Sequence, residues 1–103
     1  MKSKYRAVRT EVDGHLFPSL KESRRYGQLK MLQLAGEISE LRLQVPYELN
    51  PGGTFSYKYI ADFVYKLKDG TIEVNDAKGY RTAVYRKKAK LMLNVHGIKI
   101  KET

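Results

Sequence analysis

Two neighbouring stretches decide the fold, YIADFVYK at residues 59–66 and TIEVNDAKG at residues 71–79. Both have the length and the β-branched and aromatic content of strands, and a tight turn separates them. Because side chains alternate between the two faces of a strand, Asp76 and Lys78 share a face, and the hairpin brings Asp62 beside them. Two carboxylates and a lysine at one sheet edge suit a hard divalent cation and the activation of a water molecule.

The composition predicts a small folded domain with a polyanionic partner. The chain has 103 residues, room for one domain and one modest core, and 20 Lys and Arg stand against 11 Asp and Glu, a net charge of +9. Nucleic acid is the commonest partner of such a surface. The absence of cysteine excludes a disulfide, a zinc–thiolate site and a thiol nucleophile. Since there is neither a long apolar run nor a signal peptide, we expect no membrane contact and a cytoplasmic location.

Local signals outline the first half of the chain. A hairpin is expected between residues 5 and 17, around the Asp13-Gly14 turn. Ser19, with Glu22 three residues later, predicts the start of a helix that runs to Gly36. The strictly alternating residues 41–49 predict a strand with one apolar face, and Pro46 places that strand at an edge or a bulge.

The second half continues with strands at about residues 55–67 and 71–78. Thr82 can cap a second helix that reaches about Val95 and ends before Gly97. Its predicted apolar stripe consists of Val84, Leu91 and Val95, widened by Met92. The stretch 98–100 predicts a last short strand, which gives the order ββ-α-βββ-α-β.

Five motifs carry a resemblance: KYRA at 4–7, KESRRY at 21–26, LRLQ at 41–44, YIADFVY at 59–65 and DAKG at 76–79. Through them nearly the whole chain resembles a small phage-encoded family of unknown function. The order αβββαβ, with Asp on the second strand and Asp-x-Lys on the third, is also similar to the core of the PD-(D/E)XK nucleases. Many restriction enzymes, junction resolvases and repair endonucleases share that core.

The resemblance implies an α/β fold with a PD-(D/E)XK (restriction-endonuclease-like) core, residues 18–103, preceded by a hairpin or arm, residues 1–17, in one nuclease-like domain. It implies that Asp62 is the first acidic residue of the motif, with Ala61 replacing the usual proline. Asp76 and Lys78 fill the remaining positions, and Glu22 is similar to the extra acidic residue of resolvase-like members. Mg²⁺ or Mn²⁺ would be bound by Asp62, Asp76 and Glu22.

Each of these residues also has a purely structural interpretation. Asp62 inside an apolar run can belong to a buried hydrogen-bond network, and Asp76 with Lys78 can be an ordinary edge-strand pair. Glu22 can complete a capping box with Ser19, a role that bends its side chain away from a metal site. Gln44, on the polar side of its strand, either reaches the site or faces water.

The end of the chain is strongly basic. From Lys78 onward there are eight Lys and Arg residues and one acid, Glu102. Such a run is either a solvated face or the path of a phosphate backbone. The predicted DNA contacts are Arg86, Lys87 and Lys90 on the second helix, together with Arg81 and Gln44.

The resemblance and the small size predict a structure-selective, metal-dependent DNA endonuclease that acts on Holliday junctions or other branched DNA in phage recombination or replication, in the host cytoplasm. Paired cuts on opposed strands imply a homodimer. The alternative is a non-catalytic DNA-binding module on a nuclease-like fold, in a phage replication or packaging complex. A third class, a protein that targets a host factor, has no support in any residue.

Overall fold

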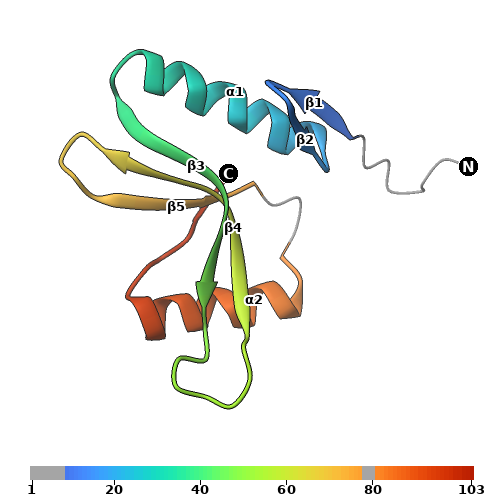
Figure 1. Cartoon of the computed structure of the whole chain (residues 1–103), viewed down its shortest axis with the longest axis vertical. Helices are drawn as coiled ribbons and strands as arrows, with labels where there is room; N and C mark the ends of the chain where they lie inside the picture. Colours follow the sequence, from blue (N-terminus) through green and yellow to red (C-terminus); the bar gives the residue numbers. More distant parts are fainter. Residues whose placement is uncertain (1–8, 78–80) are drawn as a thin grey trace, which may run out of the picture.

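A computed structural model of the chain describes residues 9–77 and 81–103, and the predicted roles of Lys78 and of the motif at residues 4–7 fall outside them. The elements follow the expected order (Figure 1). They are β1 (Thr10–Val12), β2 (His15–Phe17), α1 (Leu20–Leu34), β3 (Ile38–Glu48), β4 (Lys58–Leu67), β5 (Ile72–Asp76), α2 (Ala83–Leu91), the π-helical turn η1 (Met92–His96) and β6 (Lys101–Glu102). In the part of the chain so described, no helix has the length and apolar character needed to cross a membrane.

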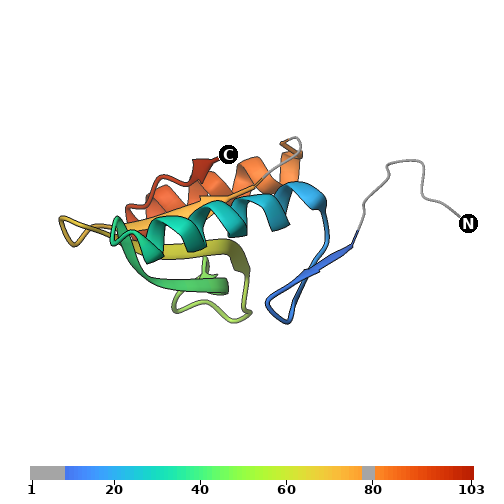
Figure 2. The same cartoon turned by 90° about the horizontal axis from the view of Figure 1, so that it is seen from above.

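Helix α1 begins as its sequence predicts. Ser19 is the N-cap, and its side chain accepts a hydrogen bond from the backbone N–H of Glu22 at 3.2 Å. The helix ends at Leu34, and Gly36 follows with φ 78°, a left-handed conformation that glycine adopts without strain. The hairpin of β1 and β2 projects from the start of α1, outside the main sheet (Figure 2).

The main sheet has the order β3-β4-β5-β6. β3, β4 and β5 pair antiparallel, whereas β6 pairs parallel with β5. Pro46 therefore lies on an edge strand, as predicted, because a proline has no N–H for an inner ladder. Asp76 lies on an inner strand, so the interpretation of this residue as part of an edge pair is wrong.

Two hydrophobic clusters cover opposite faces of the sheet. Phe63 belongs to the α1-side cluster and its neighbour Val64 to the α2-side cluster, as expected for adjacent residues of one strand. The buried members of the α1-side cluster are Phe17, Tyr26, Leu29, Ile38, Phe63 and Tyr65. Those of the α2-side cluster are Leu49, Tyr59, Ala61, Val64, Val74, Tyr85, Met92 and Ile100.

The apolar residues of β3 do not serve one cluster, as strict alternation predicted. Leu43 packs with the α1-side cluster and Val45 with the α2-side cluster. The change falls at Gln44, whose φ is 53°, and a left-handed residue inside a strand redirects the chain. The same change occurs in β4 opposite this point, because Ala61 packs in the α2-side cluster and Phe63 in the α1-side cluster. Asp62 therefore lies where the inward-facing residues of both strands switch from one cluster to the other.

Two predictions for the C-terminal part are wrong in detail. Thr82 caps α2 and Gly97 ends the helical segment with φ 68°, but Val84 is 61% exposed and Tyr85 occupies the buried position instead. Ile100 is buried by packing rather than by strand pairing, and β6 forms one residue later, at Lys101–Glu102.

The loop between β3 and β4 is held by one carboxylate. Glu48 Oε2 accepts hydrogen bonds from the backbone N–H groups of Tyr57 at 2.9 Å and Asn50 at 3.0 Å, and Oε1 accepts one from the Ser56 hydroxyl at 2.7 Å. The bond from Tyr57, followed by those from Ser56 and Asn50, lowers the pKa of Glu48 from 4.5 to about 2.

We expect the Glu48→Gln variant to lose the acid sensitivity that this loop gives the fold. Because the folded-state pKa lies below the ordinary value, the ionised carboxylate stabilises the protein above pH 4.5, and the contribution is lost as the pH falls towards about 2. Urea denaturation of both proteins from neutral pH to about pH 2 measures the difference. A wild-type acid dependence no steeper than that of the variant would contradict the role. Glu37→Gln, which removes a surface ion pair with Lys68, is the matched control.

Candidate active site

The structure brings Asp62 and Asp76 together on adjacent strands. β4 and β5 pair Phe63 with Asn75, so the next position in the register sets Asp62 opposite Asp76. The Asp76 carboxylate acts electrostatically on the Asp62 carboxyl group across these two strands. We call these two residues the acidic pair.

Asp62 lies in an environment that disfavours its charge. Burial, then the charge of Asp76 and then that of Glu22, raise the pKa of Asp62 to about 7. A hydrogen bond from the backbone N–H of Ala77, at 3.0 Å, acts in the opposite direction. Carboxyl groups from α1 and from β5 therefore both act on Asp62 in β4.

Asp76 is fixed in the core. It is 1% exposed, and its Oδ2 accepts a hydrogen bond from the Tyr59 hydroxyl at 2.6 Å. Burial and the adjacent Asp76 carboxylate raise the pKa of Tyr59 above its ordinary value, so the phenol stays protonated and keeps donating this hydrogen bond. The main-chain oxygen of Asp76 also accepts the N–H of Thr103 at 3.0 Å, which ties the residue to the end of β6.

Glu22 points to the site from the first turn of α1. It is 6% exposed, and its Oε2 accepts a hydrogen bond from Gln44 Nε2 at 3.3 Å. Capping is supplied by the Ser19 side chain, which engages the backbone of Glu22 and leaves its carboxylate directed at Gln44. Gln44, left-handed and opposite Asp62 in β3, thus connects the edge strand to α1.

The acidic pair offers carboxylate oxygens, the ligand type that hard cations prefer. Within residues 9–77 and 81–103, no group of three or more His, Asp or Glu side chains is arranged to hold a metal ion. Mg²⁺ commonly keeps several waters and is bound through one or two carboxylates, which the acidic pair can supply. Carboxylate oxygens are also what Mn²⁺ accepts.

The predicted DNA-contact residues do not all behave alike. Arg86, Lys87 and Lys90 are exposed on α2. Arg81 forms an ion pair with Glu102 at 3.3 Å, so its charge is partly compensated. The Lys87 and Lys88 ammonium groups lie 5.9 Å and 5.3 Å from the centre of the Tyr57 ring, a cation–π arrangement that gathers positive charge beside the β3–β4 loop.

Sequence reasoning missed three residues that shape this region. Tyr59 is not among the predicted site residues, yet its hydroxyl donates a hydrogen bond to Asp76. The available signal was a tyrosine in a buried strand, because a buried tyrosine O–H usually has a hydrogen-bond partner. Asn75 is 0% exposed and donates to the main-chain oxygen of Lys101, and Arg25 donates to Asn75. A buried amide in a strand was the available signal for that contact.

Comparison with known proteins identifies a family but no activity. No curated protein and no solved structure matches the chain. The model of one family, described as a protein of unknown function (DUF1064), matches residues 2–102. Since the match covers nearly the whole sequence, this chain belongs to the DUF1064 family.

Proposed function

We propose that this protein is a metal-dependent DNA endonuclease that hydrolyses phosphodiesters in branched DNA, such as Holliday junctions, during phage recombination or replication. The observation that carries the proposal is the acidic pair. Asp62 lies where the residues of β3 and β4 switch from one hydrophobic cluster to the other, and the charge of Glu22 acts on it. A buried carboxyl group whose pKa is raised by neighbouring acids, as that of Asp62 is, is of the kind concentrated at functional sites.

A purely structural role accounts poorly for the pair. Two neighbouring buried carboxyl groups repel when both are ionised, and asparagine at either position would keep the hydrogen bonds without that cost. A divalent cation turns the same arrangement into a favourable one. When bound, the metal would lower the pKa of a water molecule and polarise the scissile phosphate.

The chain's own residues divide the remaining work. Asp62 and Asp76 would bind the cation, with Glu22 directly or through water, and Tyr59 holds Asp76 in place. Lys78, which lies outside the described residues, would orient the attacking water and neutralise developing charge. The order α1-β3-β4-β5-α2-β6, with β6 parallel to β5, supports the assignment to a PD-(D/E)XK-like core.

The assembly is part of the proposal. One copy presents one acidic pair, whereas resolving a junction needs paired cuts on opposed strands, which a two-fold homodimer would provide. Light scattering together with cleavage of junction, fork, linear duplex and single strand, each with Mg²⁺, Mn²⁺ or EDTA, tests both points. Metal-dependent DNA binding without any cleavage would favour the non-catalytic module. A monomer that cuts linear duplex as fast as junctions would remove the resolvase role and leave the nuclease.

The exposed basic face of α2 gives a separate prediction for binding. We expect Arg86→Gln combined with Lys90→Gln to flatten the slope of log affinity against log salt by about 0.7–0.9 per lost phosphate contact. The matched control is Lys66→Gln with Lys68→Gln, which removes two charges that pair with Glu40 and Glu37 at the far turn of the sheet. Equal slopes for the two double variants would show that α2 faces away from DNA.

A further inference from the structure

A second polar region lies on the other face of β5. Asn75 and Asp76 are neighbours in this strand, so Asp76 meets Asp62 while Asn75 faces α1. Beside Asn75 lies a cavity of about 460 Å³, lined by Lys21, Arg24, Arg25, Gln28 and Thr103. We call it the basic cavity. Arg25 lies three residues after Glu22, a rise of about 4.5 Å along the helix, so the cavity and the acidic pair share α1 and β5.

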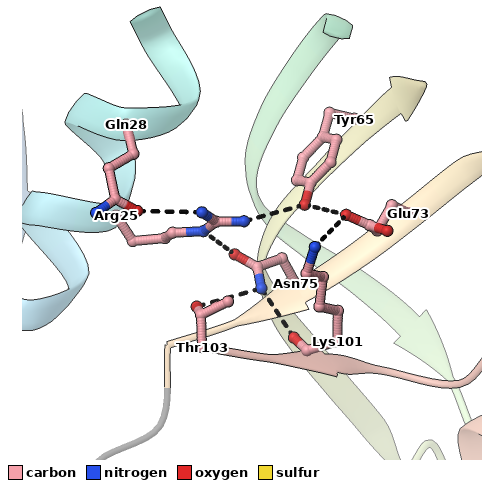
Figure 3. Close-up of polar contacts among 7 residues, drawn as sticks. All are labelled: Arg25, Gln28, Tyr65, Glu73, Asn75, Lys101 and Thr103. Atoms are coloured by element: carbon pink, nitrogen blue, oxygen red, sulfur yellow. Dashed lines mark hydrogen bonds and ion pairs between the residues drawn. The ribbon is translucent and has the colours of Figure 1, made fainter. Parts of the chain in front are cut away.

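Arg25 is held in a fixed orientation (Figure 3). Its Nε donates to Asn75 Oδ1 at 2.8 Å, its Nη1 to Gln28 Oε1 at 3.1 Å and its Nη2 to the Tyr65 hydroxyl at 3.4 Å. The two inner partners are almost fully buried, Asn75 at 0% and Tyr65 at 2% exposure. Asn75 is itself anchored through Nδ2 to Lys101 O at 2.8 Å and to Thr103 Oγ1 at 3.3 Å.

Within residues 9–77 and 81–103, no acidic side chain pairs with this guanidinium. All three contacts of Arg25 are neutral, and in the described part of the chain neither Arg25 nor Arg24 forms an ion pair. The nearest acid of the network, Glu73, is engaged by the Tyr65 hydroxyl and by Lys101 at 3.6 Å. A half-buried cation normally has a counter-charge, and the side chains that line this cavity supply none.

We infer that the basic cavity binds a phosphate group of a nucleic-acid backbone. A fixed, planar guanidinium with N–H donors to spare matches two phosphate oxygens at once, and Arg24 and Lys21 add charge at the cavity wall. The net charge of +9 selects a polyanion over an isolated anion as the source. The inference rests on the DNA-binding part of the proposed function and not on cleavage.

Two isosteric changes on the same helix test it. Gln28→Glu keeps an oxygen acceptor for Arg25 and places a carboxylate beside the guanidinium. The new carboxylate would neutralise the charge of Arg25 within the protein. Gln33→Glu makes the same charge change at a residue whose Oε1 also accepts a hydrogen bond, from Leu41 N at 2.9 Å, outside the cavity. We expect Gln28→Glu to flatten the salt slope of DNA affinity by about 0.9, and Gln33→Glu to leave it unchanged.

The measurement uses fluorescence anisotropy with a labelled DNA duplex in EDTA, so that cleavage does not enter. Identical salt slopes for Gln28→Glu and Gln33→Glu would overturn the inference. Should Gln28→Glu lower the thermal midpoint, the exposed Arg24→Gln replaces it, with exposed Arg42→Gln on β3 as its control, and the same difference in slope is expected. If the salt slopes differ as expected but the protein cleaves no DNA, this inference stands and the nuclease proposal is refuted.

The source of the phosphate is tested by NMR of the Arg25 side-chain Nε–H. Adding the duplex should shift this resonance in the wild type and not in Gln28→Glu. Inorganic pyrophosphate that shifts it, while the duplex does not, would show that the cavity takes a free anion and would overturn the assignment to a nucleic-acid backbone.

Discussion

Replacing Asp76 with asparagine is expected to reduce metal-dependent DNA cleavage by more than about 100-fold. Mutation of residues that only hold a metal ligand in place already lowers metal affinity or activity by about 10- to 100-fold. The same change should raise the thermal midpoint of the metal-free protein. Asparagine still accepts the Tyr59 hydroxyl, and it replaces a carboxyl that repels Asp62 by an amide that can donate to it. Activity and stability therefore move in opposite directions.

Glu73→Gln is the control for Asp76→Asn. Glu73 also lies on β5, but it contacts Tyr65 and Lys101 on the α1 side of the sheet. We expect this variant to lose some stability and to keep cleavage. Cleavage by purified Asp76→Asn at the wild-type rate would refute the role of the acidic pair, whatever its thermal midpoint.

Replacing Phe63 with alanine is expected to lower the free energy of unfolding by about 3–5 kcal/mol. Phe63 is 0% exposed in the α1-side cluster, and its ring lies 6.5 Å from that of Phe17 at the end of β2. The cavity would remove packing from both α1 and the hairpin, in a protein whose whole stability is of the order of 5–15 kcal/mol. Urea denaturation measures the loss, and amide exchange should show the β1–β2 hairpin opening first.

The control for Phe63→Ala is Ile60→Ala in the same strand, where the side chain is 44% exposed. Its loss should stay near the small changes typical of surface positions, within about 1 kcal/mol. Equal losses at the two positions would mean that the α1-side cluster contributes less than its burial indicates.

The parts of the fold that the sequence predicts are those determined by short-range chemistry. Ser19 and Thr82 start helices because each side chain accepts a backbone N–H three residues on. Pro46 marks an edge because its missing N–H excludes an inner strand. These effects need no knowledge of the rest of the molecule.

Other features depend on contacts between distant segments. Val84 and Tyr85 are neighbours on the helix, about 100° apart around its axis, and packing against the sheet decides which of them is buried. Glu40 and Gln44 have φ of 55° and 53°, a left-handed conformation that residues other than glycine rarely adopt. The sequence therefore contained no signal that β3 is divided between two clusters. The alternation at residues 98–100 predicts a strand, but Ile100 is buried in the core and β6 pairs with β5 only from Lys101.

The candidate site shows the same division. The two-residue period of strands was enough to bring Asp62 and Asp76 together. Gln44 was predicted only as a polar residue that either reached the site or faced water, and the structure gives it Glu22 as partner. Arg25 and Asn75 are 50 positions apart in the sequence, so their bond could be found only once α1 was seen against β5.

The exchange of clusters at Gln44 and Asp62 has a consequence for how the chain assembles. Each helix buries its apolar face against a different end of the β3–β4 hairpin, so the hairpin is needed before either cluster can close. The hairpin joins segments close in sequence and has a low entropic cost of closure. We therefore expect it to form early, with β5 carrying Asp76 to Asp62 afterwards. The electrostatic repulsion between Asp62 and Asp76 would then oppose this late step of folding. A bound cation would reduce the repulsion and accelerate the pairing of β5 with β4.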